Sequence, residues 1–176
     1  MNISFGSSYA WLDIAGTLPD TMMVQLKVGS GDASLSGAQA MSADVGSGDV
    51  KARDIKALAT AAVGSGDIEL DNVGALHVVS IGSGDVRVGG VRGDARIGSI
   101  GSGDLELRDV QGNDKDASIG SGDADVGAVR GTVTLDTLGS GDLRVRDAGG
   151  LRVRHTGSGS VDHSGIRGAV ELPKKR

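Results

Sequence analysis

Short segments in which apolar and polar residues alternate recur along nearly the whole chain. The segment from Ile68 to Leu70 reads Ile-Glu-Leu, and the same order returns 18 residues later from Val86 to Val88. Alternation with a period of two is typical of a β-strand that buries one face. No stretch has a helical period of useful length. The pattern therefore predicts an all-β fold.

Alignment of these segments gives three apolar columns. The first column holds Ala33, Val50, Ile68, Val86, Leu105, Ala124, Leu143 and Val161. The second, two residues later, holds Leu35, Ala52, Leu70, Val88, Leu107, Val126 and Val145, with His163 as the exception. The third, three residues further on, holds Ala38, Ile55, Val73, Val91, Val110, Val129, Ala148 and Ile166. A second alternation, as in Ala95/Ile97, completes each repeat, which predicts two short strands, or three, per repeat.

Glycine-rich turns separate these segments. The tetrapeptide Gly-Ser-Gly-Asp begins at Gly29, Gly46, Gly64, Gly82, Gly101, Gly120 and Gly139, and an eighth copy at Gly157 ends in Ser160. A small residue, usually glycine, also follows the third apolar column by two positions, as at Gly93, and a tight corner would require it. Copies lie 17 to 19 residues apart, and we expect the extra residue of the longer repeats at a corner.

A period this regular predicts one structural unit that stacks on itself. The polar position between the first two columns supports in-register stacking, because opposite charges alternate at most steps along Ser34, Lys51, Glu69, Arg87, Glu106, Asp125, Arg144 and Asp162. We therefore predict a single parallel β-solenoid (β-helix) of about eight to nine rungs of 17–19 residues with glycine corners. Successive rungs would lie roughly 4.8 Å apart.

The two ends of the chain depart from the repeat. We assign residues 1–28 to an N-terminal capping rung, 29–168 to the solenoid repeats and 169–176 to a C-terminal edge with a basic tail. All three aromatic residues precede the repeats, where they would close the core or, if exposed, form a docking surface: Phe5, Tyr9 and Trp11. A proline and three cations at the other end would hinder further strand pairing. We expect a monomer, with end-to-end association as the alternative.

Composition narrows the choice of partners. Glycine supplies 31 of 176 residues, proline 2 and cysteine none, so disulfides and thiolate metal sites are excluded. The net charge of −5 disfavours nucleic acid as a partner. No apolar run reaches the length of a membrane span, and no signal peptide is visible, which leaves the compartment open.

The recurring unit Gly-Ser-Gly-Asp-[Val/Ile/Leu]-x-[Val/Leu], with its following Val-x-Gly corner, resembles the bacterial putative-adhesin family of β-strand-repeat (SGD-repeat) proteins. The resemblance extends from about Gly29 to Gly168. It implies a β-solenoid fold, a cell-envelope or periplasmic setting and a non-catalytic role, with a protein or glycan at the cell surface as the partner. It identifies no ligand and no catalytic residue.

Stacking would align the aspartates and serines of the tetrapeptide into two columns. The aspartates would accept hydrogen bonds from backbone N–H groups of their own turn or of the next rung, and the serines would form a hydroxyl ladder beside them. The alternative is calcium held between rungs, with these candidate ligands: Asp49, Asp67, Asp85, Asp104, Asp123 and Asp142. The serine ladder comprises Ser47, Ser65, Ser83, Ser102, Ser121 and Ser140.

Two further groups of polar residues interrupt the regular pattern. The segment from Asn113 to Asp116, with Asp109 nearby, is polar where other repeats are apolar. It could be a protruding acidic loop that binds a cation or a partner, but we favour a solvated, loosely packed corner. His155 and His163 with Asp162 would make a minimal cation site, although exposed histidines near the end of a stack are more often incidental.

These observations predict a non-enzymatic structural or binding scaffold, adhesin-like and without a cofactor. One alternative is a calcium-binding repeat protein. A second is a carbohydrate-active β-helix, but such enzymes need a cleft and often aromatic platforms for sugar rings, and this chain has short corners and no aromatic residue beyond Trp11. No Ser, His and Asp set stands out from the repeated ladder residues.

Overall fold

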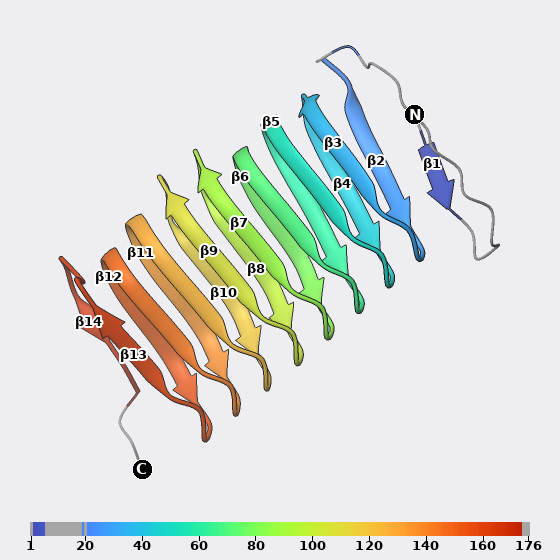
Figure 1. Cartoon of the computed structure of the whole chain (residues 1–176). Helices are drawn as coiled ribbons and strands as arrows, with labels where there is room; N and C mark the ends of the chain where they lie inside the picture. The colour runs from blue at the N-terminus through green and yellow to red at the C-terminus, as the bar shows by residue number, and fades with distance from the viewer. Residues whose placement is uncertain (1, 6–18, 20, 174–176) are drawn as a thin grey trace.

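The computed structural model describes residues 2–5, 19 and 21–173 (Figure 1). The described residues form strands and turns, with no helix. The strands are β1 (Asn2–Phe5), β2 (Met23–Val28), β3 (Ala33–Ala38), β4 (Ala40–Val45), β5 (Val50–Val63), β6 (Ile68–Ile81), β7 (Val86–Val91), β8 (Ala95–Ile100), β9 (Leu105–Val110), β10 (Asp114–Ile119), β11 (Ala124–Leu138), β12 (Leu143–Thr156), β13 (Val161–Ser164) and β14 (Val170–Glu171).

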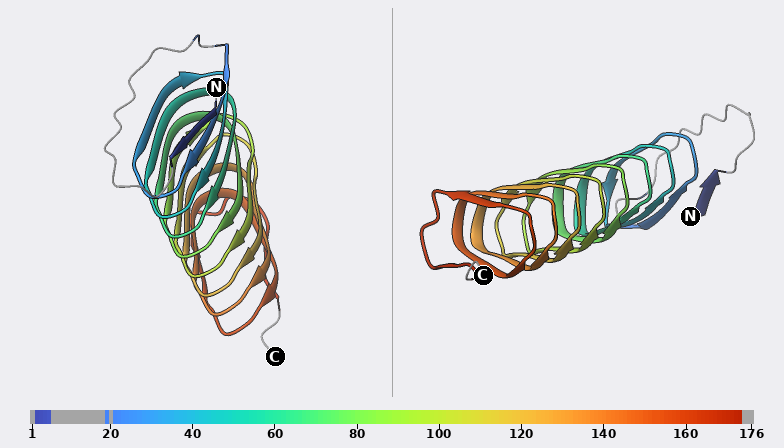
Figure 2. Two further views of the ribbon diagram at one scale, coloured as in Figure 1. Left: turned by 90° about the vertical axis from the view of Figure 1, so that its right-hand side faces the viewer. Right: turned by 90° about the horizontal axis from the view of Figure 1, so that it is seen from below.

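The strands wrap around one core as a stack of flattened loops (Figure 2). All pairings are parallel, and each rung pairs with the rung before and after it. We call the side formed by β3, β7, β9, β13 and the first halves of β5, β6, β11 and β12 the first side. The second side consists of β1, β2, β4, β8, β10, β14 and the other halves of the four long strands. This is the predicted parallel β-solenoid, with about eight turns.

The register places each apolar column inside the core. Ile68 lies opposite Val86, which lies opposite Leu105, and all three side chains are buried. Apart from two aspartates of β10, the core is aliphatic, and the third column is as deeply buried as the first, as Ile55 and Val73 show. The predicted columns are therefore confirmed, since a slip by one residue would turn every side chain to the opposite face.

Close stacking of successive turns explains the two glycines of the tetrapeptide. The second glycine is buried, and a Cβ added to Gly66 would overlap the carbonyl oxygen of Gly48. A Cβ added to the first glycine, Gly64, would lie 2.8 Å from the carbonyl oxygen of Gly46. The Ser65 N–H donates to that same oxygen at 2.7 Å. The turns thus lie in backbone contact, and no side chain fits between them.

The opposite corner is built differently from our expectation. The backbone is left-handed five residues after the tetrapeptide aspartate, with φ of 58° at Asp54, 54° at Asn72 and 71° at Gly90. The glycine column that we assigned to this corner has ordinary φ values. A Cβ on Gly93 would lie 2.9 Å from the carbonyl oxygen of Gly74, so glycine is needed there for close approach to the preceding rung.

Differences in repeat length are absorbed mainly at this corner, as predicted. The register between β5 and β6 shifts between Ile55 and Leu58, and that between β11 and β12 shifts between Val129 and Thr132. A second shift between β5 and β6 lies within the second side, where Val79 is the extra residue and is 47% exposed. That bulge lies inside a strand, so the corner does not account for every shift.

The interpretation of residues 113–116 as a solvated corner or a protruding loop is wrong. Residues 114–119 form β10, paired with β8 on one side and β11 on the other. Asp114 and Asp116 occupy the core columns and are 0% and 1% exposed, whereas Lys115 points outward. The apolar neighbours and the unchanged repeat length hold this register, since a slip by one residue would bury Lys115 instead.

The ends of the stack are only partly described. Residues 2–5 pair with β2, so the strand that contains Phe5 extends the second side. Tyr9 and Trp11 lie outside the described residues, so their predicted capping or docking role stays a prediction. At the other end, β14 pairs with β12, and Pro173 follows two residues later. The basic tail, residues 174–176, also lies outside the described part.

Candidate functional site

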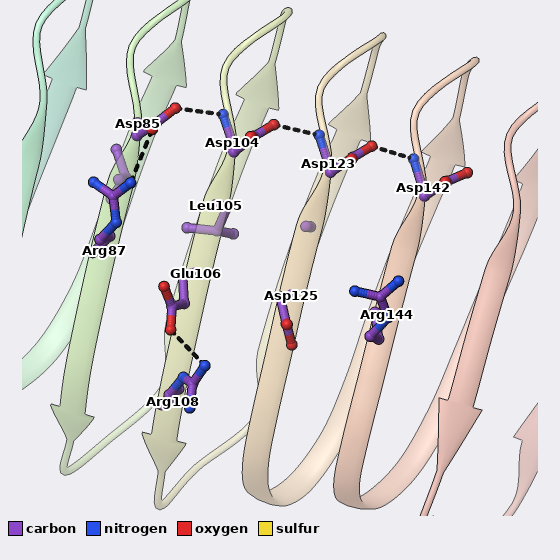
Figure 3. A pocket seen from close by; sticks show the side chains of 12 residues that line it. Asp85, Arg87, Asp104, Leu105, Glu106, Arg108, Asp123, Asp125, Asp142 and Arg144 are labelled. Atoms are coloured by element: carbon purple, nitrogen blue, oxygen red, sulfur yellow. Dashed lines mark hydrogen bonds and ion pairs between the residues drawn. The ribbon is translucent and has the colours of Figure 1, made fainter.

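The tetrapeptide aspartates form a head-to-tail hydrogen-bonded ladder at the edge of the first side (Figure 3). The Asp104 N–H donates to Asp85 Oδ1 at 3.3 Å, the Asp123 N–H to Asp104 Oδ1 at 2.9 Å, and the Asp142 N–H to Asp123 Oδ1 at 2.8 Å. The steps from Asp49 to Asp67 and on to Asp85 are alike, at 3.1 and 3.0 Å. The structure therefore supports the backbone hydrogen bonds that we predicted for this column.

The ladder ends at Ser160, where the eighth tetrapeptide has serine in place of aspartate. Asp142 Oδ1 accepts hydrogen bonds from both the N–H and the hydroxyl of Ser160, at 2.9 and 2.8 Å. These bonds, the hydroxyl first and the backbone second, lower the pKa of Asp142. The replacement of aspartate by serine thus gives the final carboxylate two donors instead of one.

The serine column lies beside the ladder with its side chains exposed at the turn. The backbone N–H of each serine donates to a glycine carbonyl of the preceding rung, and the Ser158 hydroxyl donates to Ser140 Oγ at 3.2 Å. The exposed members of the predicted serine ladder are Ser47, Ser65, Ser83, Ser102, Ser121 and Ser140. The column is a consequence of turn stacking, and the hydroxyls face solvent.

The geometry of the aspartate column bears on the calcium hypothesis. One oxygen of each carboxylate is engaged by the next rung, and Asp85 Oδ2 accepts a further hydrogen bond from Arg87 Nη2 at 3.1 Å. Among the described residues, no group of three or more His, Asp or Glu side chains could hold a metal ion. Calcium prefers six to eight oxygens. Calcium binding stays an untested alternative.

Charged side chains form the neighbouring rows of the first side. Lys51 Nζ lies 2.9 Å from Glu69 Oε2 of the next rung, as the alternating charges predicted, and this interaction raises the pKa of Lys51. Elsewhere the arginines pair differently. Arg108 Nη2 lies 2.6 Å from Glu106 Oε1 on its own strand, and Arg146 pairs diagonally with Asp125. Such exposed pairs add little stability and leave the face hydrophilic.

Between the aspartate ladder and the charged rows lies a shallow hollow of about 260 Å³ (Figure 3). Its side chains come from strands β7, β9, β11 and β12 and from the turn residue just before each strand, and both signs of charge face it. It is lined by Asp85, Val86, Arg87, Asp104, Leu105, Glu106, Arg108, Asp123, Ala124, Asp125, Asp142 and Arg144. This arrangement offers many hydrogen-bond donors and acceptors on a rigid surface.

The second side carries a row of basic residues that we did not predict from the sequence. His77, Arg96 and Lys115 lie opposite one another in β6, β8 and β10 and are exposed, without an ion pair or hydrogen bond to any other described residue. Alignment of the second alternation on its outward positions would have revealed this row. His155 lies on the second side and His163 on the first, so the two do not form the cation site that we considered as an alternative.

A family model described as "putative auto-transporter adhesin, head GIN domain" matches residues 45–147. The chain belongs to this adhesin family. The matched part of this adhesin domain contains most of the aspartate ladder and of the hollow, and it confirms the resemblance drawn from the repeated tetrapeptide. Searches of curated proteins and of solved structures found no match.

Within the described part of the adhesin domain, no helix is long and apolar enough to cross a membrane.

Proposed function

We propose that this adhesin domain is a non-enzymatic binding scaffold of the bacterial cell envelope, and that it holds a surface glycan on its first side. The observation that carries the proposal is the hollow between the aspartate ladder and the charged rows. Its position on a stack of in-register backbones gives the lining side chains a fixed spacing along the solenoid axis.

The chemistry of the lining favours a hydroxyl-rich partner. Arg87, Arg108 and Arg144 supply planar donors, and Glu106 and Asp125 supply acceptors within the same hollow. Protein partners bind mostly through a few anchors, enriched in Trp, Tyr and Arg, that fill fully desolvated pockets. Nine of the twelve residues that line this hollow are charged, and the hollow is shallow. A polar polymer that runs along the axis fits it better.

The same features argue against catalysis at this face. Enzymes that cleave glycans position an acid and a second carboxylate about the scissile bond and raise the pKa of the acid by burial. Here the four ladder aspartates of the hollow each accept a backbone N–H from the next rung, and the pKa of Asp142 is lowered. This supports binding without turnover.

A glycan array probed with the full chain tests the proposal, together with two variants of equal charge change. Arg108→Ala/Arg144→Ala removes two cations from the hollow, and Arg96→Ala/Lys115→Ala removes two from the second side. We expect the first variant to weaken binding to the selected glycan by about tenfold or more and the second to leave it unchanged. Loss in both variants alike, absence of binding, or recovery of a shortened glycan by mass spectrometry would contradict the proposal.

A further inference from the structure

The core contains two buried carboxyl groups, those of Asp114 and Asp116, which make no hydrogen bond of ordinary geometry to any described residue. Asp114 and Asp116 are 0% and 1% exposed, and they are the buried charged residues of the described part of the chain. None of their four carboxyl oxygens has a hydrogen-bond partner of ordinary geometry within the described part of the chain. Buried polar groups are normally paired, and each unpaired one lowers stability. The pair therefore needs a physical explanation beyond packing.

Apolar side chains surround both groups. Asp114 lies between Ala95 of β8 and Val133 of β11, and Asp116 lies between Ile97 and Leu135 of the same strands. All four neighbours are buried, and β9 of the same rung adds Leu105 and Leu107 to the core. Apart from each other, the two acids thus face no titratable or charged side chain within the core.

The charged side chains of the adjoining strands do not point toward Asp114 and Asp116. Lys115 of β10 and Arg96 of β8 are exposed on the outer face. On the flanks, Asp94 Oδ1 accepts the backbone N–H of Asn113 at 2.9 Å, and Asp136 of β11 lies 3.0 Å from Arg154 Nη1. Among the described residues, no cation therefore reaches into the core to neutralise the pair.

Burial in this setting favours the protonated forms. Loss of hydration raises the pKa of Asp114 to about 7, opposed by the nearby backbone N–H of Lys115. The pKa of Asp116 lies well above its usual range, chiefly because of burial and further because of the neighbouring Asp114 charge. Two residues apart on one strand, the carboxyls point to the same face and disfavour each other's ionisation.

We propose that β10 is a proton-controlled strand of the solenoid, which stays paired while both carboxyls carry protons and leaves the stack when they ionise. Its departure exposes the facing edges of β8 and β11 together with the apolar side chains beneath. Strand edges of this kind accept an added strand from a partner. The pH then determines whether β10 is paired in the stack or the facing edges of β8 and β11 are exposed.

The opening is confined to one short strand. β10 spans six residues between the corner at Gly112 and the next tetrapeptide at Gly120. The other half of the rung, β9, keeps Leu105 and Leu107 in the core and remains paired with β7 and β11. A solenoid in which each rung contacts only its neighbours tolerates such local opening.

Amide hydrogen exchange of the full chain tests this directly. The matched control strand is β4, which has six residues on the second side and no buried carboxyl. We expect protection in β10, corrected for intrinsic exchange rates, to fall by about tenfold or more between about pH 5 and about pH 8, and protection in β4 to stay constant. Constant protection in β10, or an equal loss in β4, would overturn the proposal.

Two double variants test whether Asp114 and Asp116 cause the pH dependence of protection in β10. Asp114→Asn/Asp116→Asn keeps the shape and removes the ionisation, so its β10 protection should not depend on pH. If that variant does not fold, Asp114→Val/Asp116→Leu replaces both acids with the residues that the next rung carries in the same columns. We expect that variant to fold and to protect β10 throughout. A retained pH dependence in the variant that folds would refute the assignment to these two carboxyls.

Discussion

Asp123 Oδ1 accepts the backbone N–H of Asp142 at 2.8 Å, and this contact is repeated from rung to rung along the first side. It explains how a column of like charges persists. Neighbouring carboxylates about 4.8 Å apart repel by about 1 kcal/mol in water. A hydrogen bond to a charged acceptor contributes about 1.5–3 kcal/mol. The aspartate is therefore retained as an acceptor for the next turn.

Two substitutions at one ladder position should therefore differ in their effect. Asp123→Asn keeps the acceptor oxygen and removes two repulsive contacts, so the free energy of unfolding should change by less than about 0.5 kcal/mol. Asp123→Ala leaves the Asp142 N–H without its partner and should cost about 1 kcal/mol. Urea denaturation of both variants measures the difference. Equal destabilisation by both would show that the charge itself is required, as a bound metal would require it.

The stacked turns predict a contrast between two glycines. A Cβ on Gly103 would overlap the carbonyl oxygen of Gly84, whereas a Cβ on Gly127 meets no atom within 4 Å. Gly103→Ala should therefore destabilise the stack by about 3 kcal/mol or more, and Gly127→Ala should be neutral or slightly stabilising. Thermal melting compares them. Similar melting temperatures for the two variants would contradict the close contact of successive turns.

The left-handed corner predicts a stabilising substitution. Ala128 has a φ of 55° at the position where other rungs carry Gly, Asn or Asp. The left-handed conformation costs a residue with a Cβ roughly 1–2 kcal/mol. Ala128→Gly relieves this cost but adds freedom to the unfolded chain, so we expect a net gain of about 0.5 kcal/mol in urea denaturation. A loss of stability would mean that this corner does not need the left-handed backbone.

Burial of Asp114 and Asp116 predicts that the free energy of unfolding rises as the pH falls from neutral. The folded-state pKa values of Asp114 and Asp116 lie above those of the unfolded chain, so the folded state binds more protons and stability rises as the pH falls from neutral. Each carboxyl adds up to about 1.4 kcal/mol per pH unit in that window. The Asp142 carboxylate has a lowered pKa, so its contribution is lost only in stronger acid.

Chemical denaturation across this range checks the prediction. Wild type should be most stable in mild acid, and Asp114→Val/Asp116→Leu should show no rise between neutral pH and that maximum. A variant that keeps the rise would show that other groups cause it.

Metal removal should have no effect on the scaffold. Because one oxygen of each ladder carboxylate is already bonded to backbone, we expect the melting temperature to be the same with EDTA and with added calcium. A large increase with calcium would favour the calcium-binding alternative, since backbone hydrogen bonds alone would not then explain the aspartate ladder.

The solenoid could be predicted because its determinants are local and repeated. The alternation around Ile68 and the spacing of the tetrapeptide define which side chains face the core. The left-handed corner could have been predicted from its column, because residues that readily adopt a positive φ, namely Gly, Asn and Asp, fill it apart from Ala128. Our alignment assigned the corner to the glycine column at Gly93 instead.

Charge was a misleading signal at β10. The unchanged repeat length aligns Asp114 and Asp116 with apolar columns. Acids are rarely buried, however, so their charge favours a solvated corner over a core strand. Pairing of β10 with both neighbours outweighs that preference in the folded chain. The hollow on the first side could not be predicted, because it depends on how exposed side chains pair across rungs.

A residue-by-residue map of glycan binding would show whether the first side is the binding face. Amide chemical shifts of the full chain would be recorded by NMR during titration with the glycan selected on the array. We predict perturbations at Arg87, Glu106, Asp125 and Arg144, the residues that face the hollow, and none at Arg96 or Lys115. Perturbations confined to the second side or to the ends of the stack would contradict binding on the first side.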